Sequence, residues 1–141
     1  MPRRTPPFRT AATWFLLSVV AVGACASDAD MPRDPDVEIT VQMAEYDFVS
    51  DVVPEFRAGQ TVRFVVENVG VIPHEVQVLD TEATVLAQTG PVAAGDRTEL
   101  VVAFDDAGVY QMICDIDDHL SRGQRALFEV RHADGTSVLE D

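Results

Sequence analysis

Four side chains that can bind a transition-metal ion lie in the second half of the chain. They are His74, Cys114, His119 and Gln124. Cysteine sulfur and histidine nitrogen are common protein donors to such ions, and an amide oxygen can serve as a weak additional ligand. These residue types therefore indicate a metal site, provided that the fold brings them together.

Three of these residues are predicted to point toward the same end of the core. Each lies an even number of positions from apolar residues of its own segment. These are Val76 and Val78 for His74, Tyr110 and Met112 for Cys114, and Ala126, Phe128 and Val130 for Gln124. Because alternate side chains of a strand lie on one face, all three are expected to face inward at a strand end. His119 lies in the turn between the Cys114 segment and the Gln124 segment.

Each residue taken singly has a simpler interpretation. A lone buried histidine is more often a hydrogen-bonded core residue than a ligand, and a lone buried cysteine packs like a small apolar residue. Met43 and Met112 are in phase with their strands and are interpreted as core residues. Glu75 and Asp115 each follow a candidate ligand and point the other way, so we expect them on a solvated face, with support of the neighbouring ligands as the alternative. The four donors in combination still favour a metal site.

The segments that must position these residues have the two-residue period of β-strands. Apolar and polar residues alternate in three runs, whose apolar members are Ile39, Val41 and Met43, then Val62, Phe64 and Val66, then Leu100, Val102 and Phe104. Glycine-containing turns separate the runs, and about seven short strands at this spacing predict an antiparallel β-sandwich. Residues 81–92 are compatible with either a short helix or an irregular crossover.

Length and charge exclude several classes of protein. A chain of 141 residues has room for one domain and not for a multidomain enzyme. Its 47% hydrophobic and 24% charged residues are typical of a folded globular domain. The formal net charge is −14, with 24 acidic residues against 10 basic ones, all of them arginine. Nucleic acid is therefore not an expected partner.

The first 24 residues are predicted to be an export signal rather than part of the fold. Arginines precede a nearly uncharged run over residues 11–24, which small residues close. The run is shorter than the about 20 residues that a membrane-spanning helix needs. The sequence VGAC at 22–25 is similar to a bacterial lipobox, in which Cys25 is lipidated and becomes the mature N-terminus. The alternative is an ordinary cleavage site that releases a soluble protein.

The remaining chain divides into three parts. Residues 25–36 are acidic and contain prolines, which predicts a disordered tether, residues 37–131 form the folded domain, and residues 132–141 a polar tail. The protein is expected outside the cytoplasm, with a lipid at Cys25 as its sole membrane contact. Because Cys25 is then acylated or removed, Cys114 is the remaining thiol and no intramolecular disulfide can form.

Two motifs resemble those of the cupredoxins, the small blue copper proteins, and the plastocyanins in particular. The segment NVGVIPHE at 68–75 is similar to an Asn-x-Gly-x-Pro-His motif with one residue inserted, and GVYQMIC at 108–114 is similar to Gly-x-Tyr-x-x-x-Cys. The resemblance covers residues 39–131. It implies a mixed antiparallel and parallel Greek-key β-sandwich of about seven to eight strands that binds one copper ion through His74, Cys114 and His119.

The chain departs from the family pattern at two places. No methionine follows Met112, and Gln124 occupies the position of the usual axial methionine, as in the stellacyanin branch. The usual Pro-Gly before the second histidine is replaced by Asp117 and Asp118, which puts acidic side chains at the rim of the site.

These features predict one-electron transfer between redox partners outside the cytoplasm, by a monomer that is not an enzyme. The resemblance implies that His119 forms the exposed edge through which electrons pass. The acidic rim favours a partner with a basic surface, and adaptation of the whole surface to high salt is the alternative explanation of the acidity. Two alternatives stay open. One is copper carriage or sequestration without redox turnover. The other is covalent catalysis by Cys114 with His74 or His119 as base, against which the inward strand phase argues.

Overall fold

A computed structural model of the protein describes residues 34–50 and 54–140. Cys25 and the predicted export signal lie outside these ranges. The described residues form nine strands: β1 (Val37–Ala44), β2 (Asp47–Val49), β3 (Phe56–Arg57), β4 (Gln60–Asn68), β5 (Gln77–Leu79), β6 (Val85–Gln88), β7 (Arg97–Phe104), β8 (Gly108–Ile113) and β9 (Arg125–Arg131). No helix in this part of the chain has the length and apolar character needed to cross a membrane.

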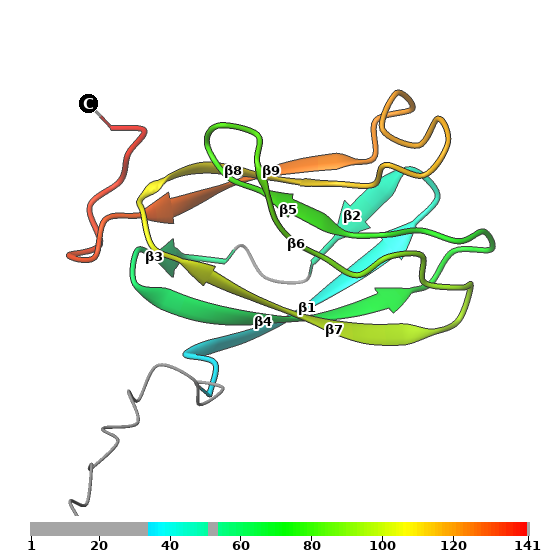
Figure 1. Cartoon of the computed structure of the whole chain (residues 1–141), viewed down its shortest axis with the longest axis horizontal. Coiled ribbons are helices and arrows are strands. Elements are labelled where there is room, and N and C mark those ends of the chain that lie inside the picture. The colour runs from blue at the N-terminus through cyan, green and yellow to red at the C-terminus, as the bar shows by residue number, and fades with distance from the viewer. Residues whose placement is uncertain (1–33, 51–53, 141) are drawn as a thin grey trace, which may run out of the picture. The chain divides into compact units, whose positions relative to one another are not determined.

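The strands form two sheets that face each other as a sandwich (Figure 1). One sheet has the order β2-β1-β4-β7 and the other β3-β9-β8-β5-β6. The β1–β4 and β3–β9 pairs are parallel, and the other pairs are antiparallel. The predicted all-β sandwich with mixed sheets is therefore confirmed.

The number of strands in the described residues is nine rather than seven or eight. The strands that the alternation did not indicate are short, with three residues in β2, two in β3 and four in β6. β6 lies within the segment for which a helix or a crossover was considered, and it pairs antiparallel with β5 through Val78 and Ala87. Three of the four residues of β6 are exposed, so burial imposed no apolar alternation on its sequence.

The three alternating runs supply the inner faces of β1, β4 and β7. Their apolar members, Ile39, Val41, Met43, Val62, Phe64, Val66, Leu100, Val102 and Phe104, are all buried and belong to one core. In β1 and β7 the residues between them are more exposed, which is the reason for the two-residue period. Met43 and Met112 both belong to this core, as predicted.

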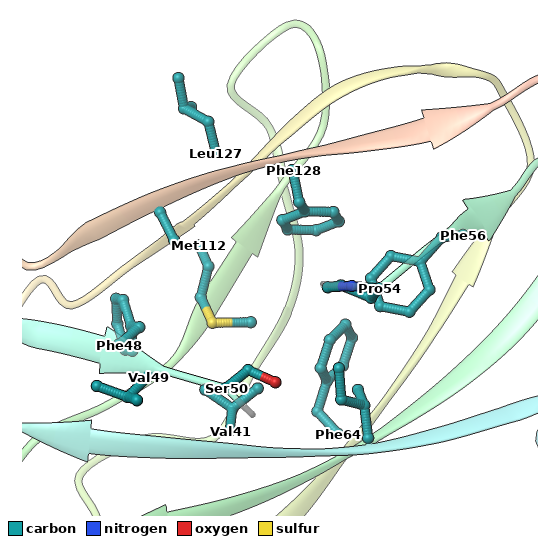
Figure 2. A pocket seen from close by; sticks show the side chains of 12 residues that line it. Val41, Phe48, Val49, Ser50, Pro54, Phe56, Phe64, Met112, Leu127 and Phe128 are labelled. Atoms are coloured by element: carbon teal, nitrogen blue, oxygen red, sulfur yellow. The ribbon is translucent and has the colours of Figure 1, made fainter. Parts of the chain in front are cut away.

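An aromatic cluster fills one end of the sandwich. It consists of Phe56, Phe64, Phe104, Tyr110 and Phe128, and the rings in contact have centroids 5.0–6.5 Å apart. Beside this cluster, a largely apolar pocket of about 130 Å³ lies between the sheets, with the Met112 side chain among its walls (Figure 2). In Figure 1, β3 with Phe56 lies at the opposite end of the sandwich from the β8–β9 loop. The aromatic cluster and the candidate donors thus lie toward opposite ends of the sandwich.

Candidate metal centre

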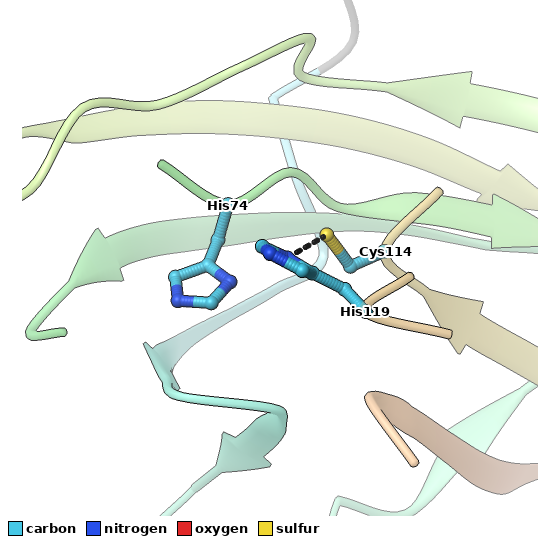
Figure 3. A group of neighbouring side chains, drawn as sticks. All are labelled: His74, Cys114 and His119. Carbon is cyan, nitrogen blue, oxygen red and sulfur yellow. Dashed lines mark hydrogen bonds between the residues drawn. The ribbon is translucent and has the colours of Figure 1, made fainter. Parts of the chain in front are cut away.

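The structure brings the predicted donor residues together at one end of the sandwich. One ligand atom from each of His74, Cys114 and His119 lies within 4.8 Å of the others (Figure 3). His74, Cys114 and Gln124 are 0% exposed and His119 is 5% exposed. All four therefore share a buried site, as strand parity predicted for His74, Cys114 and Gln124.

The β8–β9 hairpin positions three of the four residues. Cys114 directly follows β8 and Gln124 directly precedes β9, and the Cys114 N–H donates to the Gln124 carbonyl at 3.2 Å. His119 lies in the connecting loop, where its N–H donates to the Ile116 carbonyl and its carbonyl accepts from the Gln124 N–H, each at 3.0 Å. Asp117, at the place of the family's Pro-Gly, has φ of 47°, which aspartate tolerates better than most residues. The loop therefore folds back on itself and turns His119 inward.

The segment before β5 positions His74. Its main chain forms an antiparallel bridge with Val92, through hydrogen bonds of 3.1 and 2.7 Å. The buried Asn68 amide donates to the carbonyls of Ile72 and Val92, at 2.8 and 2.9 Å, and its oxygen accepts from the Gly70 N–H at 3.0 Å. Asn68 thus ties the loop that carries His74 to the neighbouring segment, which explains the asparagine in the 68–75 motif.

Two close contacts join the four side chains in two pairs. His74 Nδ1 lies 2.9 Å from Gln124 Oε1, and Cys114 Sγ lies 3.4 Å from His119 Nδ1. The two imidazole centroids are 4.8 Å apart, at an angle of 50°. The Gln124 amide nitrogen donates to the Ala44 carbonyl at 3.3 Å, which directs its oxygen toward His74. The two Nδ1 atoms, the sulfur and the amide oxygen therefore line one small space.

Burial controls the protonation of these groups in the metal-free protein. Burial raises the pKa of the Cys114 thiol, while the Glu75 N–H, which donates to Sγ at 3.4 Å, acts in the opposite direction. Burial lowers the pKa of His74, and its hydrogen bond to Gln124 partly opposes this shift. The metal-free site consequently favours a neutral thiol and a neutral His74 imidazole at pH 7. A metal that binds the thiolate must displace the thiol proton.

His119 is covered rather than exposed, which corrects the expectation that it forms an open edge. The Tyr46 ring packs edge-on against it, with centroids 5.2 Å apart. The Arg122 guanidinium lies 4.7 Å from the centre of the Tyr46 ring and pairs with Asp118 at 2.7 Å. This cover comes from the β1–β2 turn and from the β8–β9 loop itself, and it leaves His119 5% exposed. The acid at 118 is thus paired with an arginine.

Glu75 is buried, which corrects its assignment to a solvated face. It is 8% exposed, and its Oε1 accepts from Gln77 Nε2 at 2.8 Å and from the Asp115 N–H at 3.2 Å. These donors replace the water that the carboxylate loses, so the burial is tolerated. Glu75 therefore links the segment before β5 to the residue after Cys114. Asp115 is exposed, as expected.

Two residues beside the centre, Tyr46 and Glu45, gave no signal in the sequence. Both lie in the turn between β1 and β2, and Tyr46 has φ of 65°. Glu45 Oε1 accepts a hydrogen bond from the Val71 N–H, which holds the pKa of this carboxyl below its usual value. An exposed acid in a turn is ordinary by itself. Only the long-range pairing of β1 with β4 places it beside the His74 segment.

A family model described as "Cupredoxin-like domain" matches residues 13–126. The chain belongs to the cupredoxin family. No curated protein matches it. Among solved structures, this cupredoxin is similar to auracyanin B, with 16% identity over 71% of this chain and 92% of that chain, at a TM-score of 0.63. It is also similar to auracyanin A, a "blue" copper protein from Chloroflexus aurantiacus, with 18% identity over 67% and 99% of the chains, at a TM-score of 0.54.

A larger protein has the same fold in part of its chain. A multicopper oxidase from Campylobacter jejuni is 12% identical over 72% of this chain and 31% of that chain, at a TM-score of 0.57. At these identities the likeness concerns the fold.

The donor set fits the copper ion that the cupredoxin family implies. One thiol, two imidazoles and a weak oxygen donor match the ligand set of copper electron-transfer sites. All four side chains are buried and their donor atoms face one space. One copper ion is therefore the cofactor that the family and the site indicate together. The assignment of individual ligands stays a prediction.

Proposed function

We propose that this cupredoxin is a blue copper protein that transfers single electrons between partners outside the cytoplasm. His74 and His119 would hold the copper through Nδ1, Cys114 through its thiolate, and Gln124 through its amide oxygen as a weak axial ligand. The observation that carries the proposal is the common buried space of these donors, within 4.8 Å for the cysteine and the histidines and 2.9 Å from His74 Nδ1 to Gln124 Oε1. When bound, copper supplies a one-electron couple between Cu(I) and Cu(II).

The protein's own residues hold the donors in one arrangement. The His74–Val92 bridge and the Asn68 amide both fix the segment that carries His74. The main-chain bond between Cys114 and Gln124 fixes the two ends of the β8–β9 loop. A ligand set that cannot rearrange serves both oxidation states with little movement, which favours rapid electron transfer.

The same burial argues against an enzyme. Cys114 is 0% exposed and its pKa is raised, whereas a catalytic cysteine needs an accessible thiolate. The match to the C. jejuni oxidase spans 31% of the oxidase chain, so that enzyme is about three times as long as the part that shares this fold. We propose electron transfer without catalysis of a further reaction.

Copper carriage or sequestration is the second candidate function, because the same ligands would bind Cu(I). A stepwise redox titration of the copper-loaded protein, with a Cu(I) chelator present, separates the two. An electron carrier is expected to cycle reversibly and to keep its copper. A protein that carries or sequesters copper would lose Cu(I) to the chelator. Loss of copper in the reduced state would therefore contradict electron transfer as the function.

We also propose that the protein is a monomer, anchored outside the cytoplasm by a lipid on Cys25. The support is the sequence VGAC at the end of the apolar run. Cys25→Ser is expected to move the protein from the membrane fraction to the soluble fraction. An unchanged distribution between the two fractions would contradict the lipid anchor.

A further inference from the structure

The outer edge of the His74 ring faces a carboxylate that no motif identified. A Cβ atom built on Gly70 would lie 2.5 Å from Glu45 Oε1 and 3.2 Å from His74 Nε2. Glu45 Oε1 and His74 Nε2 thus lie next to the same small space beside Gly70. In Figure 3, one ring nitrogen of His74 is turned toward Cys114 and His119, and the other is turned away from them.

The nitrogen on this outer edge lacks a hydrogen bond. His74 Nε2 is buried and has no hydrogen-bond partner among the described residues, whereas Nδ1 lies 2.9 Å from Gln124 Oε1. A neutral imidazole that binds a metal through Nδ1 carries its proton on Nε2, and a buried N–H without an acceptor destabilises the site. The loaded site therefore needs an acceptor at Nε2.

We propose that Glu45 is a positioning residue for the copper centre and accepts the Nε2–H of His74 when copper is bound. The inference rests on the proposed function, in which His74 binds copper. Metal-binding histidines commonly donate their second N–H to a carboxylate, which fixes the tautomer and makes the imidazole a stronger donor. Glu45 is itself held in place by the Val71 N–H and lies on the exposed side of the turn, where its side chain can adjust.

The absence of a side chain at position 70 permits this approach. Gly70 does not have a positive φ, so its backbone conformation is open to other residues. A methyl group at this position would press on both the carboxylate and the imidazole edge. The glycine of the 68–75 motif is therefore explained by close packing between Glu45 and His74.

Three variants of the purified protein test the role of Glu45. Glu45→Ala removes the acceptor, and Glu45→Gln keeps an acceptor oxygen for the Val71 N–H and for His74 but removes the charge. Asp47→Asn is the matched control, because it neutralises an acid two positions away whose carboxylate accepts from its neighbour, the Phe48 N–H, at 2.8 Å. The readouts are Cu(I) affinity by chelator competition and the Nε2–H signal of His74 in the NMR spectrum of the Cu(I) form.

Glu45→Ala is expected to weaken Cu(I) binding by about 10-fold or more. It is also expected to shift the Nε2–H signal or to broaden it by faster exchange with water. Glu45→Gln should keep the signal with a smaller loss of affinity, and Asp47→Asn should match wild type. Wild-type affinity together with an unchanged Nε2–H signal in Glu45→Ala would overturn the inference. If wild-type protein shows no thiolate-to-copper band, the proposed function fails first and the inference fails with it.

Discussion

His74 Nδ1 and Gln124 Oε1 lie 2.9 Å apart, although the two residues are 50 positions apart in the chain. His74 enters from the segment before β5, and Gln124 from the first position before β9. The contact shows that the glutamine oxygen faces the space that the cysteine and the histidines enclose. It is the structural reason for assigning Gln124, rather than a methionine, to the axial position.

This assignment predicts a change in reduction potential. An amide oxygen stabilises Cu(II) more strongly than a thioether does, so Gln124→Met is expected to raise the potential. Potentiometric titration of the visible band measures it, and Gln88→Met, on the exposed surface of β6, is the control. An unchanged or lower potential in Gln124→Met would mean that Gln124 is not an axial ligand.

Burial of His74 makes the metal-free protein sensitive to acid. The pKa of His74 is lowered in the fold, so between its ordinary value of 6.5 and its lower folded value the unfolded chain binds more protons. The free energy of unfolding should therefore be highest above pH 6.5 and decrease as the pH falls toward the folded pKa.

Urea titrations of the metal-free protein between about pH 5 and pH 7.5 measure this dependence, a range that lies above the ordinary pKa of carboxyl groups. His74→Leu should flatten the dependence, and His132→Gln, at an exposed position, should leave it as in wild type. If His74→Leu keeps the full acid dependence, another group is responsible.

Local pattern was sufficient to predict the central strands and the inward position of three candidate donors. Ile39, Val41 and Met43 alternate because one face of β1 is buried, and the same parity argument placed Cys114 and Gln124 inside, since each directly adjoins a strand. The same argument placed His74 inside, although His74 precedes β5 by three positions. It holds there because Val76 and Val78, at alternate positions after His74, are also buried.

The parts that escaped prediction depend on contacts between distant segments. Glu45 and Tyr46 reach the His74 segment and His119 only because β1 pairs in parallel with β4, and a turn sequence contains no sign of that pairing. Glu75 has the parity of a solvated residue, and its burial depends on donors from Gln77 and the Asp115 main chain. The short strands β2 and β3 are too brief to show a period.

The acidic rim predicts electrostatic steering of a cationic partner. Asp118 is paired with Arg122, so the other exposed carboxylates within the β8–β9 loop are those of Asp115 and Asp117. The rate constant for electron transfer to a cationic acceptor should fall with ionic strength, and Asp115→Asn with Asp117→Asn should reduce this dependence.

Neutralising Asp105 and Asp106 is the matched control, because they lie in the β7–β8 turn at the opposite end of the sandwich (Figure 1). Equal effects of the two double substitutions would mean that the overall acidity of the surface, rather than the rim, governs the encounter.

The aromatic cluster is predicted to supply a large share of the stability. Phe104 is 0% exposed and contacts four other aromatic rings, so Phe104→Ala should lower the free energy of unfolding by about 3–5 kcal/mol. Chemical denaturation measures this loss. Leu127→Ala, at a position that is 61% exposed, serves as the control and should change stability by no more than about 0.5 kcal/mol. Similar losses in the two variants would contradict this view of the core.

The visible absorption spectrum of the oxidised, copper-loaded protein tests the central claim most directly. A buried Cys114 thiolate beside His74 and His119 should give an intense thiolate-to-Cu(II) band with one copper ion bound per chain, and Cys114→Ala should abolish the band. A colourless Cu(II) complex of the wild-type protein, or a band that survives in Cys114→Ala, would contradict the assignment of this site as a blue copper centre.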